Sequence, residues 1–167
     1  MIVSNSTILI FLAKINKLDL LKRLFNFVLI PEAVKKESVD EGKKKNYIDA
    51  TQIEKAINDG WIKVEHVQIE NIIENLNIDE GEAEAISLAH QKKIKLLMDQ
   101  SHARDAAKLL KLQPRGTLYV LYLALSKKII NYDEYLNLLE ELIGYGFRMS
   151  QEVYLEAIRM GKEFKKK

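Results

Sequence analysis

Apolar residues along the chain follow two alternating patterns. Short apolar runs of the length of single strands occur at residues 2–4, 27–30, 61–67 and 95–98. Between them, apolar residues recur every three or four positions, which is typical of helices that bury one side; these segments are 6–15, 18–25, 31–39, 48–59, 81–93 and 101–112. Strands alternating with helices predict βαβ units around a mostly parallel sheet. We therefore expect an α/β fold, a three-layer α/β/α sandwich with right-handed crossovers.

The last part of the chain has only the helical pattern. Residues 131–164 predict two or more amphipathic helices, interrupted near Gly144 and Gly146. We expect residues 1–130 to form the α/β domain and residues 131–167 to form a helical extension packed on it. Gly42 is expected to mark a break between elements, and lysines 43–45 to lie in an exposed loop.

Composition limits the class of protein. The 167 residues suit one domain with a sizeable core, and 47% apolar and 30% charged residues indicate a globular chain. No apolar run has the ~18 residues that a membrane span needs, and the apolar opening lacks the features of a signal peptide. The absence of cysteine excludes disulfides and thiolate metal sites, and fits a cytoplasmic setting.

The charge is almost balanced, with 26 basic and 24 acidic residues and a net charge of +2. This differs from the strongly basic surface of a dedicated nucleic-acid binder. A polyanion would therefore have to bind through a local basic patch or through a metal ion.

Four polar residues lie on the apolar sides of four different elements: Asn5, Glu37, Glu82 and Asp99. Glu82, for example, shares a helical stripe with apolar residues three, four and seven positions later. Its neighbour Glu84 faces elsewhere and is expected to be an ordinary surface charge.

Carboxylates rarely lie unpaired at core-facing positions, because desolvating a charge is costly. A divalent cation allows several of them to converge. Asn5 and Asp99 each follow a predicted parallel strand, and ligands of open α/β sheets bind beyond the carboxyl ends of the strands. Oxygen ligands without His or Cys favour Mg²⁺ or Mn²⁺ over zinc.

Each residue also has a purely structural interpretation. Asn5 and Asp99 are both suited to helix N-caps. Glu37 fits an exposed position beside the first layer of the core, and Glu82 fits the favourable dipole at the start of a helix. Taken one at a time, the structural roles are the better interpretation, whereas the joint placement of the four residues favours a site.

Several segments resemble the PIN-domain family. The opening IVSNSTILIFLAKI is similar to the first PIN motif, where a strand ends in Asp followed by Ser or Thr. PEAVKKE resembles the second motif, DEGEAEAISLA the third and KLLMDQSHARDAAKLLKL the fourth. The similarity continues through RGTLYVLYLALSKKII to GFRMSQEVYLEAI, so that it covers nearly the whole chain.

The resemblance implies a metal-dependent ribonuclease that binds Mg²⁺ or Mn²⁺. The acids of the family fall on Asn5, Glu37, Glu82 and Asp99, with Glu37, Glu82 and Asp99 as the catalytic set and all four as metal ligands. Two positions depart from the family: Asn5 replaces the usual Asp, and Gln100 stands where the fourth motif commonly offers another Asp. The pocket therefore carries one or two fewer negative charges than an active relative.

The resemblance also implies roles for nearby residues and for partners. Ser6 positions a phosphate or a carboxylate, or else caps the first helix together with Thr7. Arg104 contacts a substrate phosphate or pairs with Asp99. His102 is expected to be a cap or a surface residue rather than a general base. The implied partners are RNA, a cognate antitoxin as for VapC-type toxins, and a second copy in a homodimer.

Two functions stay open at this point. The first is a PIN-type endoribonuclease, the toxin of a toxin–antitoxin pair. The second is a degenerate PIN protein that binds RNA or a protein partner without cleaving, which Asn5 and Gln100 favour. An unrelated hydrolase or nucleotide-binding protein is disfavoured, because the chain has no Gly-rich phosphate loop, GxSxG elbow or HExxH motif.

Overall fold

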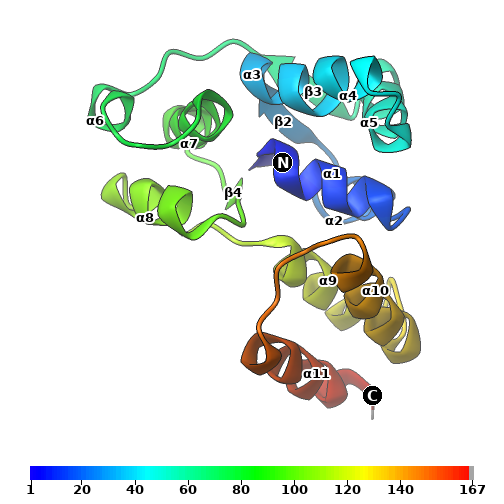
Figure 1. Ribbon diagram of the computed structural model, residues 1–167. Helices are drawn as coiled ribbons and strands as arrows, with labels where there is room; N and C mark the ends of the chain where they lie inside the picture. The colour runs from blue at the N-terminus through cyan, green and yellow to red at the C-terminus, as the bar shows by residue number, and fades with distance from the viewer. Residues whose placement is uncertain (166–167) are drawn as a thin grey trace.

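The computed structural model of the protein describes residues 1–165 (Figure 1). Its centre is a parallel sheet of four short strands in the order β3-β2-β1-β4. The strands are β1 (Ile2–Ser4), β2 (Val28–Pro31), β3 (Ile62–Glu65) and β4 (Leu96–Leu97). Parallel neighbours must be joined by crossovers, and helices supply each of them, as the alternating pattern predicted.

Helices make up most of the rest of the chain. Those before β4 are α1 (Ser6–Lys14), α2 (Asp19–Phe25), α3 (Glu32–Lys35), α4 (Glu41–Lys44), α5 (Ile48–Asn58), α6 (Asn71–Glu74) and α7 (Glu80–Lys92). A π-helical turn, η1 (Lys36–Asp40), joins α3 to α4. The helices after β4 are α8 (Ser101–Leu109), α9 (Thr117–Ser126), α10 (Tyr132–Gly144) and α11 (Gln151–Lys165).

Side chains of the sheet alternate between two separate cores. Successive residues of a strand point to opposite faces, so Ile2 belongs to one core and Val3 to the other. The larger core lies under α1, α2, α5, α9 and α10, and the smaller one under α7 and α8. The three-layer α/β/α arrangement and the parallel sheet are therefore as predicted.

The segment around Gly42 differs from the prediction. Residues 41–44 form α4, so Lys43 and Lys44 are exposed on a helix rather than in a loop. Gly42 is buried at the contact between α4 and α5. A Cβ at this position would lie only 2.7 Å from the Cβ of Ala50. The glycine therefore serves close helix packing, which sequence periodicity does not reveal.

The C-terminal helices contribute to the larger core. The Tyr135 hydroxyl donates a hydrogen bond to the carbonyl oxygen of Ala157 at 2.9 Å, which joins α10 to α11. Burial raises the pKa of Tyr135 to about 12. The Phe164 ring packs edge-on against Tyr122 of α9, with ring centroids 5.5 Å apart. These contacts fix α11 against both α9 and α10.

We predict that Gly161→Ala destabilises the protein, because the added Cβ would lie 2.6 Å from the buried Tyr135 ring. Overpacking of this kind costs about 1–3 kcal/mol, or a fall in Tm of roughly 2–4 °C per kcal/mol for a chain of this size. Thermal unfolding followed by circular dichroism measures it. Gly144→Ala is the matched control, since no atom lies within 4 Å of its Cβ position and its stability should not fall. Equal Tm values for the two variants would contradict the packing described for α11.

Candidate functional site

The carboxyl ends of β1 and β4 bring Asn5 and Gln100 together. Asn5 is 2% exposed and caps α1, with its side-chain oxygen accepting from the Ile8 backbone N–H at 3.4 Å. The Asn5 Nδ2 group donates to Gln100 Oε1 at 2.8 Å, and Gln100 Nε2 donates to the Thr7 hydroxyl at 2.5 Å. Two neutral amides are thus bonded where the family pattern offers two carboxylates, which would repel each other at this distance without a cation.

Glu37 lies on η1, the π-helical turn between α3 and α4. Its Oε2 accepts a hydrogen bond from the Ser6 hydroxyl at 2.7 Å, which connects it to the start of α1. Its Oε1 lies against Gly81, where an added Cβ would be 2.5 Å away. Only a glycine at the start of α7 allows the Glu37 carboxylate to come this close.

Glu82 lies in the first turn of α7 and is 3% exposed. It forms a capping box with Asp79: the Glu82 backbone N–H donates to Asp79 Oδ1 at 2.8 Å, and the Asp79 N–H donates to Glu82 Oε2 at 3.3 Å. The same Oε2 lies 3.1 Å from Nε2 of His102. Glu82 is therefore held by the start of α7 and faces the first turn of α8.

The carboxylates of Glu37 and Glu82 both have raised pKa values. Burial is the largest cause for Glu37, which the Ser6 hydrogen bond opposes and the charges of Asp79, Glu41 and Glu82 reinforce. Burial is also the largest cause for Glu82, followed by the Asp79 charge, while His102 and the capping hydrogen bond oppose them. The charged forms of both groups are therefore disfavoured, which is the electrostatic condition that a bound cation relieves.

Asp99 lies two residues beyond the end of β4 and is hydrogen-bonded to Thr117 at the start of α9. Its Oδ1 accepts from the Thr117 backbone N–H at 2.9 Å, and its Oδ2 accepts from the Thr117 hydroxyl at 2.6 Å. Burial raises the pKa of Asp99, while the Thr117 hydrogen bonds and the Arg104 charge lower it. Asp99 thereby holds the start of α9, and its two hydrogen bonds orient the carboxylate toward Thr117.

The six residues expected at the site fall into two groups. Asn5, Ser6, Glu37 and Glu82 gather around the starts of α1, α7 and α8. Asp99 and Arg104 lie toward Thr117, where the Arg104 guanidinium donates to the carbonyl oxygen of Pro114 at 3.2 Å. The Arg104 charge lowers the pKa of Asp99, but among residues 1–165 no ion pair within 4.0 Å joins the two.

The side chains present fit one divalent cation better than two. Among residues 1–165, no three His, Asp or Glu side chains are grouped as a metal site. However, Mg²⁺ is commonly held by one or two carboxylates, with water and substrate phosphate as the other ligands. Glu37 and Glu82 meet that requirement. The amide oxygens of Asn5 and Gln100 could serve as additional, neutral metal ligands.

Sequence patterns missed several residues that shape the site. Glu84 is no simple surface charge: it is half-buried, and its carboxylate accepts from the Ala33 backbone N–H at 2.9 Å, which caps the helix leading to Glu37. Asp79 was missed although the D-x-x-E spacing of residues 79–82 signals a capping box. Thr117 lies 18 residues from Asp99, and no local pattern connects the two.

Comparison with known proteins identifies the family. A family model described as a PIN domain matches residues 1–163, and the chain therefore belongs to the PIN-domain family. The sheet and its covering helices agree with this assignment. PIN domains are typically nucleases that use divalent metal ions. No curated protein and no solved structure matches the chain. None of the helices within residues 1–165 has the length and apolar character needed to cross a membrane.

We predict that Glu37→Gln makes the metal-free protein more stable at neutral pH. A raised carboxyl pKa means that the folded state binds the proton more tightly than the unfolded state, so stability falls as pH rises from 4.5 through the folded pKa. Gln retains an acceptor for Ser6 but carries no charge. Tm should rise by a few degrees at pH 7, at roughly 2–4 °C per kcal/mol, and this gain should shrink toward pH 4.5.

The control for this prediction is Glu140→Gln, the same change on the exposed side of α10. Thermal unfolding in EDTA across this pH range provides the comparison. A Glu37→Gln variant that is no more stable than the Glu140→Gln variant at pH 7 would show that the Glu37 carboxylate is not under electrostatic stress.

Proposed function

We propose that this chain is an endoribonuclease of PIN type that depends on Mg²⁺ or Mn²⁺. The observation that carries the proposal is a pair of neighbouring carboxylates with raised pKa values, the buried Glu82 in the first turn of α7 and the half-buried Glu37 on η1. Structural roles alone do not require two acids to be desolvated together. A cation between them and an RNA phosphate would offset this cost.

The proposed roles follow from the contacts of each residue. Glu37 and Glu82 hold the ion, and Ser6 orients Glu37 through its hydroxyl. Asn5 adds a neutral ligand through its amide oxygen. When bound, the ion lowers the pKa of water and offsets charge on the phosphate undergoing hydrolysis. The starts of α1, α7 and α8 point partial positive charge toward the same place, which favours a phosphate there.

Asp99 and Arg104 have less direct proposed roles. Asp99 remains a candidate ligand from the family pattern, but its two hydrogen bonds to Thr117 favour a positioning role at the start of α9. Arg104 is anchored to Pro114 beside Asp99 and is proposed to contact an RNA phosphate. His102 is exposed and touches only Glu82 among these acids, so we propose that it modulates the Glu82 charge.

The biological setting is proposed by analogy with the family. PIN nucleases of prokaryotes include VapC-type toxins, and a short antitoxin protein would be the corresponding partner of this chain. A homodimer is the proposed assembly. The exposed apolar side chains near the C-terminus, among them Tyr145, Val153 and Leu155, support a protein contact on that side.

A second candidate function is RNA binding without cleavage. It is supported by the hydrogen bond between Asn5 and Gln100, which satisfies both amides without any ion. In this case the pocket keeps the shape of a nuclease site, but its charge is too low to retain a metal.

We predict slow, metal-dependent cleavage by the chain and faster cleavage by an Asn5→Asp/Gln100→Asp variant. Restoring two acids should raise the rate by about 10-fold or more, since ligands and their supports commonly contribute 10–100-fold to affinity or activity. The assay uses mixed single-stranded RNAs with Mn²⁺, with Mg²⁺ and with EDTA. Glu82→Gln serves as the inactive control, because Gln keeps the capping acceptor but loses the charge.

Each outcome of this assay distinguishes the candidates. Cleavage that needs metal and disappears in Glu82→Gln supports the nuclease. Cleavage that persists in EDTA or in Glu82→Gln does not come from this pocket, and it would contradict the assignment of the nuclease activity to Glu37 and Glu82. If neither the chain nor the double variant cleaves, the nuclease proposal fails and the non-cleaving function replaces it.

A further inference from the structure

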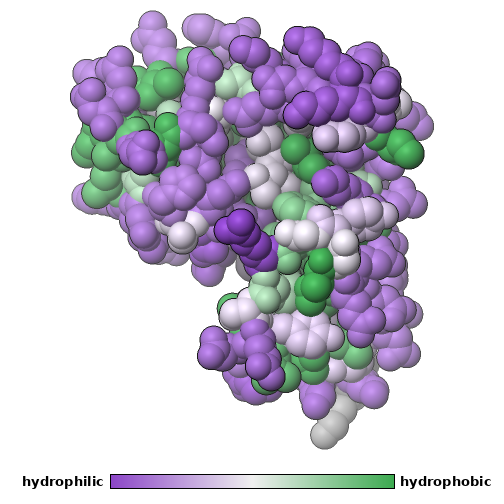
Figure 2. Space-filling model, in the orientation of Figure 1, coloured by the Kyte–Doolittle hydropathy of each residue, from purple (hydrophilic) through white to green (hydrophobic). Residues whose placement is uncertain are grey.

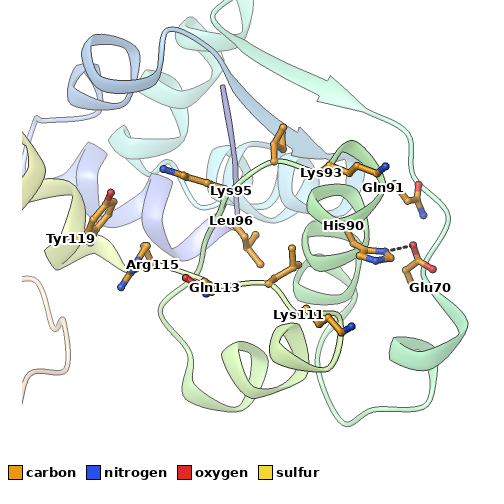
Figure 3. A pocket seen from close by; sticks show the side chains of 12 residues that line it. Glu70, His90, Gln91, Lys93, Lys95, Leu96, Lys111, Gln113, Arg115 and Tyr119 are labelled. Atoms are coloured by element: carbon orange, nitrogen blue, oxygen red, sulfur yellow. Dashed lines mark hydrogen bonds and ion pairs between the residues drawn. The ribbon is translucent and has the colours of Figure 1, made fainter.

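A second hollow, which we call the cationic hollow, lies between the end of α7, β4 and the loop before α9 (Figure 3). Its volume is about 720 Å³. Its charged lining consists of Lys93, Lys95, Lys111, Arg115, His90 and Glu70. Lys95 immediately precedes β4, so the hollow lies near the end of that strand opposite to Gln100.

The positive charge of this hollow is uncompensated. Within residues 1–165, no carboxylate lies within 4.0 Å of the charged nitrogens of Lys93, Lys95, Lys111 or Arg115, whereas the neighbouring Lys92 and Lys108 are both ion-paired. The single carboxylate of the lining, Glu70, lies 2.9 Å from His90. Four cations without an ion-pair partner therefore line this one hollow, in a chain whose net charge is only +2.

The cations are spread out rather than focused on one point. Figure 3 shows Lys95 and Arg115 on the side of Tyr119, and Lys93 and Lys111 on the side of His90. The floor between them includes Leu96, with other apolar side chains. A compact anion is best held by cations that converge on it, whereas this arrangement matches the repeated charges of an extended polyanion.

The lining of the cationic hollow overlaps with that of a groove that approaches the candidate site. It shares Arg115 and Tyr119 with a groove of about 740 Å³ between α9 and α11, which also includes Arg104 and Arg148. That groove shares Asp99, Phe147 and Arg148 with a third hollow, which is lined by Thr7, Gln100 and His102. The space-filling view shows the molecule indented between α8 and α11 (Figure 2).

The walls of the connecting groove differ in charge. Glu152 and Glu156 lie on its α11 side, where Glu156 is paired with Arg159 at 2.6 Å. Arg104 and Arg115 lie on its opposite side, and the Arg115 guanidinium lies 5.5 Å from the centre of the Tyr119 ring. A negatively charged strand would therefore follow the side of Arg104 and Arg115.

We propose that the cationic hollow binds the phosphate backbone of single-stranded RNA that extends from the candidate site past Arg104 and Arg115. This inference rests on the proposed function for its ligand class. Cations interleaved with an aromatic ring are the usual means of holding a single strand, because phosphates meet the charges and bases stack on rings. An acidic protein segment would need the cations but not the half-buried Tyr119 ring beside Arg115.

The test is the salt dependence of RNA binding. A labelled oligouridylate of about 12 nucleotides, long enough for an extended contact, is titrated in EDTA, and anisotropy is read between about 50 and 200 mM salt. Lys95→Ala/Lys111→Ala removes two proposed phosphate contacts. The slope of log K against log salt should become shallower by about 1.4, or 0.7 per contact. The affinity lost between these salt concentrations should then be about 7-fold smaller.

Lys44→Ala/Lys55→Ala is the matched control, with the same charge change on exposed residues of α4 and α5. Its slope should equal that of the starting chain. Equal slopes for the two double variants would overturn the proposal, even if the chain cleaves RNA. The proposal also fails if the Lys95→Ala/Lys111→Ala change weakens the binding of a poly-glutamate peptide but leaves the binding of the RNA unchanged. Binding in EDTA is independent of cleavage, so loss of catalysis with an intact slope difference would leave this inference standing and remove the proposed function.

Discussion

Burying a carboxylate away from water is costly unless an opposite charge or strong hydrogen bonds compensate it, and the pocket of this protein is arranged around a buried carboxylate, Glu82, and a half-buried one, Glu37. Glu37 reaches the pocket through a π-helical turn, and Glu84 caps the helix before that turn. Glu82 is fixed by its capping box with Asp79. Gly81 leaves the space that lets Glu37 approach the start of α7. The local structure thus holds the two acids in place at an electrostatic cost, which is typical of sites that bind a cation.

The amides of Asn5 and Gln100 determine how much charge the pocket has left. They satisfy each other and Thr7 through hydrogen bonds, so the pocket is stable without a cation. With acids at both positions, the same distance would produce repulsion that a cation or a shared proton relieves. The pocket of this PIN-domain chain therefore holds two carboxylates, Glu37 and Glu82, near two neutral amides. It would hold a divalent ion less tightly than a pocket with four acids.

Much of the fold was predictable from periodicity, because strands and amphipathic helices bury one side at fixed spacing. The candidate site was predictable only in part. Strand ends located Asn5 and the pair Asp99–Gln100, but not which member of that pair faces the pocket. That choice depends on Thr117, which follows β4 by a whole helix and whose backbone and hydroxyl bind Asp99. The cationic hollow could not be predicted from the sequence either, since its lysines and Arg115 come from separate segments that only the tertiary fold brings together.

The most direct measurement is the affinity for Mn²⁺, determined by titration with paramagnetic resonance detection of the free ion. The starting chain is compared with Glu37→Gln, Glu82→Gln and Asp99→Asn. We expect one weak site that either glutamate variant abolishes and that Asp99→Asn changes little, because Asp99 is bound to Thr117. A chain that binds no Mn²⁺, or a site lost in Asp99→Asn but kept in the two glutamate variants, would contradict a metal centre built on Glu37 and Glu82.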